Sequence, residues 1–202
     1  MSVVIIDYGM GNVASVQKSL SFLNIDSVIS NKNSDIEQAK YIILPGVGSF
    51  KQGMDNLRKS NLIDLLNNEV MEKKKPFLGI CLGMQLIVST GTEPEICDGL
   101  GWIKGKVIKM IEPNKRVPHL GWNNIQTNGE GFWKASDEKD FYFIHSYHVV
   151  PEDDSNIAAR VNYGNDYVAA IQQDNIFATQ FHPEKSQQAG LTILTHFFQH
   201  HA

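Results

Sequence analysis

The sequence predicts an α/β fold in which a doubly wound, largely parallel sheet is flanked by helices and followed by an antiparallel, β-rich portion. Through residues 1–89, short apolar runs alternate with stretches of helical periodicity, and this alternation is typical of parallel strands joined by crossover helices. Beyond Gly99 the apolar segments become short and β-rich, with turn residues between them. No Pro- or Ser-rich linker interrupts the 202 residues. We therefore expect one domain spanning residues 1–202.

The first half supplies the parallel strands. Buried strands are predicted from four apolar runs, at Val3–Asp7, Ile25–Ser30, Tyr41–Leu44 and Pro76–Ile80. Helices are predicted from apolar residues at helical spacing, over Asn12–Leu23, Leu57–Met71 and Leu82–Ser89. Strands and helices thus alternate at the spacing of crossover connections.

The second half has a different texture. Short strands are predicted at Trp102–Ile111, Asn124–Thr127, Phe141–Ile144, Ile157–Asn162, Tyr167–Gln173 and Ile176–Phe181. A C-terminal helix over Leu191–Gln199 closes the predicted fold.

Composition excludes several classes of protein. The net charge of −4 gives no long-range attraction to nucleic acid or to an anionic membrane. No apolar run approaches the roughly 20 residues that span a bilayer, and the N-terminus lacks the basic region of a signal peptide. Cys81 and Cys97 have the spacing of neither a disulfide framework nor a CxxC pair. We expect a cytoplasmic protein that binds neither nucleic acid nor membrane.

Cys81 is the strongest candidate for a catalytic residue. The segment Gly79-Ile80-Cys81-Leu82-Gly83 has a nucleophile between glycines at a predicted strand-to-helix junction, where the glycines permit the tight turn that exposes a nucleophile. A helix N-terminus favours the thiolate, and the Leu82 N–H is suited to bind an oxyanion. The motif alone is equally consistent with a small, buried hydrophobic cysteine. Cys97, in a turn-rich region, has no predicted role.

A base and an orienting carboxylate follow another predicted strand. In Phe181-His182-Pro183-Glu184 the histidine and glutamate are two residues apart, which places them on one side of an extended segment. A carboxylate on one imidazole nitrogen fixes the tautomer and leaves the other nitrogen for sulfur. Alone, this pattern is also typical of solvated surface residues.

The segment PGVGSF at residues 45–50 follows the third predicted strand. Its two glycines permit a backbone that turns N–H groups into a cavity, as a second oxyanion donor requires. It lacks the pattern of a phosphate-binding P-loop, and a simple tight turn is the plainer alternative.

Together these motifs resemble the class I (triad-type) glutamine amidotransferase family over nearly the whole chain. The resemblance rests on PGVGSF, GICLGMQ at 79–85 and QFHPEKS at 180–186. Within that family, the chain resembles the glutaminase subunits of imidazole glycerol phosphate synthases through DYGMGN at 7–12, VPHLGWN at 117–123 and HSY at 145–147. Leu120 stands where those subunits usually have methionine, a change that conserves volume.

The resemblance implies a role for each matching residue. Cys81 is the nucleophile, His182 the base and Glu184 its orienting group. The oxyanion is bound by the backbone N–H groups of Leu82 and Val47, the latter after a peptide flip. Glutamine is held by residues at four further positions, Gly48, Gln85, Ser146 and Tyr147. Neither a metal nor an organic cofactor is expected.

The resemblance also implies a heterodimer. Ammonia from L-glutamine passes to a (β/α)8-barrel cyclase subunit of the histidine pathway, which uses it to form imidazole glycerol phosphate. Tyr8, Asn12 and Trp122 are placed at or near the docking surface. Core packing remains an alternative for Trp122, and Asn12 is also suited to cap the following helix.

Three hypotheses follow. The first is a glutaminase that supplies ammonia for histidine biosynthesis. The second is a paralogue with the same chemistry that feeds another synthase, for example one that aminates a sugar for surface polysaccharide. The third is a non-catalytic binding or regulatory protein, which the intact set of Cys81, His182 and Glu184 disfavours. A protease or esterase is disfavoured by Gln85 and by the pair Ser146-Tyr147, which match residues that bind free glutamine.

Overall fold

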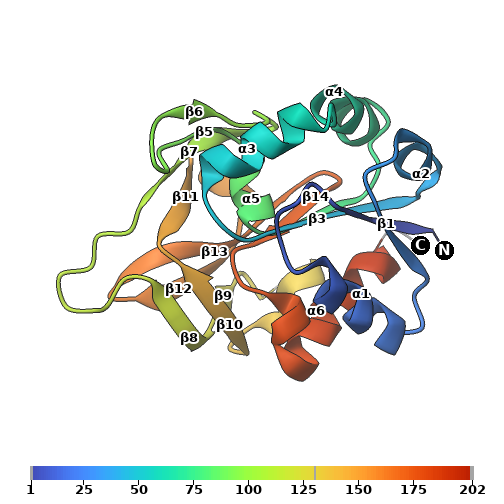
Figure 1. Ribbon diagram of the computed structural model, residues 1–202. Helices are drawn as coiled ribbons and strands as arrows, with labels where there is room; N and C mark the ends of the chain where they lie inside the picture. Colours follow the sequence, from blue (N-terminus) through green and yellow to red (C-terminus); the bar gives the residue numbers. More distant parts are fainter. Residues whose placement is uncertain (1, 130, 201–202) are drawn as a thin grey trace.

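The computed structural model describes residues 2–129 and 131–200 (Figure 1). Its central sheet has eight strands in the order β2 (Ser27–Ser30), β1 (Val3–Ile6), β3 (Tyr41–Gly46), β4 (Phe77–Cys81), β14 (Ile176–Thr179), β13 (Asn165–Gln173), β12 (Ile157–Tyr163) and β9 (Gln126–Thr127). The strands from β2 to β14 are parallel. Their 2-1-3-4-5 order is that of a flavodoxin-like sheet, so the predicted fold class is confirmed.

Helices cover both faces of the central sheet (Figure 1). One face carries α2 (Asn33–Gln38), α3 (Phe50–Lys59), α4 (Ile63–Leu66) and α5 (Leu82–Leu86), and the other carries α1 (Val13–Phe22) and α6 (Gln187–His200). Val4 and Ile6 of β1 belong to the first core, whereas Val3 and Ile5 belong to the second. A strand buried on both faces reads as a continuous apolar run, which is why the parallel strands could be predicted. No helix in the described ranges is long and apolar enough to cross a bilayer.

The antiparallel portion predicted for the second half forms two smaller sheets and the far end of the large one. One small sheet pairs β8 (His119–Asn124) with β10 (Asp140–His145). The other has the order β11 (Tyr147–Pro151), β7 (Ile103–Lys109), β5 (Val88–Gly91) and β6 (Cys97–Asp98). Short 3₁₀ segments lie at Gly131–Ser136, Asp154–Asn156 and Pro183–Lys185.

Two predicted helices are wrong in extent. The helix predicted over Leu57–Met71 is broken, because Asn61 has a φ of +53°, a left-handed conformation that a right-handed helix does not include. After the break, α4 leads into a π-helical turn over Asn67–Glu72. The helix predicted over Leu82–Ser89 ends at Leu86, and the next residues form β5 instead. Strand β5 pairs with β7, a tertiary contact that local periodicity does not report. Helix α2, strands β6 and β11, and most of α3 and of β8 were not predicted.

The topology brings four distant segments to one edge of the sheet. Strands β1, β3, β4 and β14 are neighbours and parallel, so their carboxyl ends lie side by side. Gly46 is the register partner of Cys81, and Thr179 is the partner of Ile80. Ligand sites of open α/β sheets lie beyond the carboxyl ends of the strands. The candidate residues that follow these strands therefore meet there.

Candidate active site

Cys81 occupies a sharp turn between β4 and α5. Its backbone has φ +54° and ψ −104°, a conformation rare for a non-glycine residue that costs on the order of 1–3 kcal/mol. The side chain is 6% exposed. The turn predicted at this strand-to-helix junction is confirmed, and such a turn is how an α/β enzyme exposes a nucleophile.

The glycines beside Cys81 allow the turn to pack closely. A Cβ at Gly83 would lie 1.8 Å from the carbonyl oxygen of Leu44 in β3. A Cβ at Gly79 would lie 2.9 Å from the carbonyl carbon of Gly83. Both positions therefore require glycine for steric reasons.

His182 and Glu184 form a buried pair. The imidazole Nδ1 lies 2.7 Å from Glu184 Oε1, and each side chain is 2% exposed. Among the described residues, His182 Nε2 has no nitrogen or oxygen partner. Burial acts to lower the pKa of His182, but the interactions with Cys81 and with the Glu184 carboxylate outweigh it and raise the pKa to about 10. This environment favours the imidazolium form of His182.

The sulfur of Cys81 has two further neighbours. It lies 3.9 Å from the carbonyl oxygen of Ile144 and 3.7 Å from the amide nitrogen of Gln180, which donates to it. Gln180 directly follows β14 and is fully buried. The sulfur therefore lies against two distant parts of the chain, β10 and the segment that follows β14.

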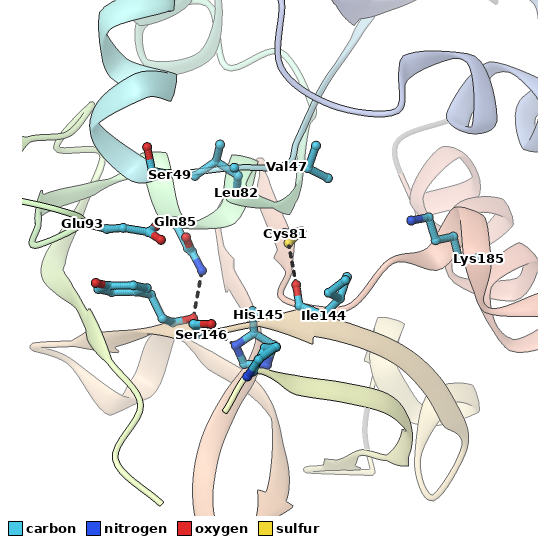
Figure 2. A pocket seen from close by; sticks show the side chains of 13 residues that line it. Val47, Ser49, Cys81, Leu82, Gln85, Glu93, Ile144, His145, Ser146 and Lys185 are labelled. Atoms are coloured by element: carbon cyan, nitrogen blue, oxygen red, sulfur yellow. Dashed lines mark hydrogen bonds between the residues drawn. The ribbon is translucent and has the colours of Figure 1, made fainter. Parts of the chain in front are cut away.

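A cavity of about 410 Å³ opens beside this sulfur. In Figure 2, Cys81 lies between Gln85 and Glu93 on one side and Lys185 on the other. The lining of the cavity includes all the residues predicted to bind glutamine or its oxyanion, namely Val47, Gly48, Leu82, Gln85, Ser146 and Tyr147. Their roles remain predictions, but the fold brings them together.

Hydrogen bonds fix one wall of the cavity. Gln85 Nε2 donates to the Tyr147 carbonyl oxygen at 2.9 Å and to Gln180 Oε1 at 3.1 Å. His145 Nδ1 also lies 2.9 Å from the Tyr147 carbonyl, and its Nε2 lies 3.2 Å from His119 Nδ1. Burial lowers the pKa of His145 to about 3 and that of His119 to about 4. Both rings are therefore neutral near pH 7.

Two residues of the site were missed at the level of sequence. Gln180 lies two positions before His182, and period-two spacing in an extended segment offered a signal that both side chains face the same way. Glu93 also lines the cavity, and its Oε2 accepts from the Phe50 N–H at 3.2 Å. It follows β5 in a turn, where no sequence pattern distinguishes it from a solvated residue. Burial raises the pKa of Glu93, against the effect of this hydrogen bond.

The three residues predicted at a partner surface lie in different settings. Trp122 is 48% exposed on β8. Asn12 is exposed and caps α1, where its side chain accepts from the Ser15 N–H. Tyr8 is only 3% exposed, because its ring packs in the core beside α5. Its hydroxyl is buried near Gly46 and has no partner among the described groups, so this side chain is part of the interior and not of the surface.

The arrangement is suited to nucleophilic acyl transfer. The imidazole interacts with the cysteine on one side and with the carboxylate on the other, which is the order that covalent catalysis requires, and a cavity adjoins the sulfur. Within residues 2–129 and 131–200, no group of three or more His, Cys, Asp or Glu side chains has the geometry to hold a metal ion.

Comparisons with known proteins agree with this geometry. The family model described as "Glutamine amidotransferase class-I" matches residues 4–201. The imidazole glycerol phosphate synthase subunit HisH 1 of Campylobacter jejuni (strain RM1221) is 44% identical over 200 residues, covering 98% of this chain and 99% of the relative. Subunit HisH of Aquifex aeolicus is also 44% identical over 200 residues, covering 98% and 96%.

Solved structures share the fold at lower identity. The structure of PurLQS from Thermotoga maritima superposes with a TM-score of 0.75 at 16% identity, covering all of this chain and 99% of that one. A crystal structure described as a glutamine amidotransferase gives a TM-score of 0.74 at 20% identity, covering 97% of each chain. From the family match and the full-length relatives, the chain belongs to the class-I glutamine amidotransferase family and, within it, to the HisH subunits of imidazole glycerol phosphate synthase.

Proposed function

We propose that this chain is the glutaminase subunit of an imidazole glycerol phosphate synthase, which hydrolyses L-glutamine and passes the ammonia to a cyclase subunit. The observation that carries the proposal is the strained Cys81 turn, which lines the cavity and interacts with His182 of the buried His182–Glu184 pair. The full-length similarity to HisH subunits supports it. A compartment that keeps Cys81 reduced, such as the cytoplasm, suits this chemistry.

The proposed reaction proceeds in two steps. The Cys81 thiolate attacks the side-chain amide carbon of glutamine, and the backbone N–H groups of Leu82 and Val47 stabilise the oxyanion. His182 gives its proton to the departing nitrogen, which leaves as ammonia, and a glutamyl thioester remains on Cys81. Water deprotonated by His182 then attacks the thioester, which releases glutamate and restores the Cys81 thiolate and the protonated His182.

Substrate recognition is assigned to the cavity wall. Because the Gln85 amide nitrogen is engaged by Tyr147 and Gln180, its oxygen is the group it can offer to glutamine. The Glu93 carboxylate is the acidic group lining the cavity, and a bound α-ammonium would offset the cost of its burial. Gly48 and Ser146 complete the proposed contacts.

An exposed apolar surface near the cavity supports docking of the cyclase. Leu120 and Ile144 are cross-strand partners on β8 and β10, 57% and 40% exposed, and Trp122 follows on the same strand as Leu120. Val47, 41% exposed, and Ile144 also line the cavity. Ammonia released to bulk water near pH 7 is protonated, so an apolar seal at the cavity mouth would keep it reactive. A (β/α)8-barrel cyclase is the partner we propose for this surface.

The test uses the complex with the histidine-pathway cyclase. With glutamine as nitrogen donor, Cys81→Ala should abolish both glutamate release and imidazole glycerol phosphate formation. With an excess of ammonium salt instead, the same variant complex should still form the product. Substantial glutamate release by Cys81→Ala would contradict the proposed chemistry.

The acceptor synthase is tested separately. Several relatives have the numbered names HisH 1 or HisH 2. Because such numbering indicates more than one copy in an organism, the same complex is also used to test for a role in another pathway. Strong glutaminase activity without imidazole glycerol phosphate formation in the wild-type complex would indicate a different synthase, for example one that aminates a sugar.

A further inference from the structure

A chain of buried hydrogen bonds leads from the Cys81 sulfur to the cavity wall. Gln180 Nε2 donates to the sulfur at 3.7 Å, and Gln180 Oε1 accepts from Gln85 Nε2 at 3.1 Å. The same Gln85 nitrogen donates to the Tyr147 carbonyl at 2.9 Å. Gln180 is 0% and Gln85 4% exposed. The reaction steps proposed above give Gln180 no role, although it contacts the reacting atom.

The donor-to-acceptor direction of these hydrogen bonds is fixed by the Tyr147 carbonyl. A backbone carbonyl can only accept, so Gln85 must turn its NH₂ group towards Tyr147. That NH₂ group also reaches Gln180, which must therefore present its amide oxygen to Gln85. The group that remains for the sulfur is the NH₂ of Gln180. Flipping either amide would set two donors or two acceptors against each other, and an unmade hydrogen bond is costly in a buried site.

We infer that Gln180 is a further catalytic residue, whose amide N–H stabilises the thiolate of Cys81 relative to the thiol. A hydrogen bond to an ionised acceptor is stronger than one to a neutral group, so the contact favours the charged nucleophile. The sulfur thereby gains a stabilising group that is independent of His182 and comes from the end of β14. The catalytic part of this inference rests on the proposed function, but the effect on the sulfur does not.

Gln180 has a second, positioning effect through its oxygen. By accepting from Gln85, it holds the Gln85 oxygen available to the cavity. Loss of the Gln180 side chain should therefore weaken glutamine binding and reduce thiolate formation. The two effects are separable, because alkylation of Cys81 needs no glutamine.

The test measures alkylation of Cys81 by iodoacetamide as a function of pH in the full-length chain, with each cysteine peptide quantified by mass spectrometry. Gln180→Met and Gln180→Leu replace the amide by an apolar side chain of similar size and so remove the donor. In both variants the midpoint of the alkylation profile should rise by about one pH unit, the equivalent of a tenfold loss of thiolate. In the complex, both should also raise the KM for glutamine.

Thr179→Val is the matched control. Thr179 is fully buried next to Gln180, and its hydroxyl donates to the Phe181 carbonyl at 3.0 Å. It should lower stability but leave the Cys81 midpoint unchanged. Cys97, half-buried on β6 in a different sheet from Cys81, is the internal reference in every sample.

An unchanged Cys81 midpoint in a folded Gln180→Met or Gln180→Leu variant would overturn the inference, even if KM rose. An equal shift in Thr179→Val would overturn it too, because the shift would then reflect general loosening. Because alkylation requires neither glutamine nor a partner, a shifted midpoint with no glutaminase activity in the wild-type complex would count against the proposed function alone.

Discussion

The imidazole Nδ1 of His182 and the carboxylate Oε1 of Glu184 lie 2.7 Å apart across a single proline, and both side chains are almost completely buried. The contact keeps the proton on Nδ1 in the neutral ring and leaves Nε2 for the sulfur. It also contributes to the raised pKa of His182. The carboxylate thus sets the tautomer of the base and adds to the larger effect of Cys81 on its pKa.

Replacing this carboxylate should impair chemistry more than binding. Glu184→Gln removes the negative charge and allows an amide to hold the wrong tautomer, so we expect kcat to fall by at least about tenfold. The KM for glutamine should change little, because Glu184 is not among the residues lining the cavity. Steady-state kinetics of the complex measure both. A fall in kcat/KM that came entirely from KM would contradict the orienting role.

Replacing Glu93 should impair substrate binding more than chemistry. Glu93→Gln keeps the shape of the side chain but removes the charge proposed to bind the α-ammonium of glutamine, so KM should rise by about tenfold or more with a smaller change in kcat. For a glutamine analogue that lacks the α-amino group, the wild type and Glu93→Gln should have about the same low kcat/KM. Unchanged KM in Glu93→Gln would remove this residue from the binding site.

The buried histidines predict acid sensitivity. His145 and His119 have pKa values lowered to about 3 and about 4, whereas an unfolded histidine titrates near 6.5. Between these values the unfolded chain binds more protons, so the free energy of unfolding should fall as pH drops from about 6.5 towards 4. Urea unfolding across this range measures it. His119→Phe, which keeps a ring for stacking on Phe143 and Tyr163, should show a weaker dependence on pH, and an identical slope would contradict this assignment.

Docking is tested with two exposed aromatic residues. Trp122→Ala should weaken binding of the cyclase by about tenfold or more, since a large aromatic side chain at the centre of an interface is often a hot spot. Phe22→Ala is the matched control, because Phe22 is 71% exposed at the end of α1, on a different part of the surface. Titration calorimetry compares the two. Equal affinity in Trp122→Ala and wild type would place the interface elsewhere.

Features formed by residues that are close in the sequence could be predicted best. Gly79, Cys81 and Gly83 lie within one turn, and His182 and Glu184 within one extended segment, so their spacing carries their geometry. The broken helix between Leu57 and Met71 is harder, since its apolar periodicity continues across the break at Asn61, and an asparagine alone does not mark a break.

Contacts between distant segments could not be predicted from local pattern. Gln180 reaches Cys81 because β14 and β4 are sheet neighbours, and Glu93 enters the cavity because β5 folds back from α5. Tyr8 is a second example, in which a tertiary contact buries a residue that was predicted at the surface. Its motif suggested a surface role, whereas the close approach of the residue 8–11 loop to Gly46 buries the ring.

During turnover, Cys81 should carry the acyl group of glutamine as a thioester. Rapid acid quenching of the complex during turnover, followed by peptide mass spectrometry, tests it most directly. We predict a glutamyl adduct on the peptide that contains Cys81, at a level that falls when glutamine is exhausted, and none on the peptide that contains Cys97. Full glutaminase activity in Cys81→Ala, or an adduct on any other residue, would contradict this role of Cys81.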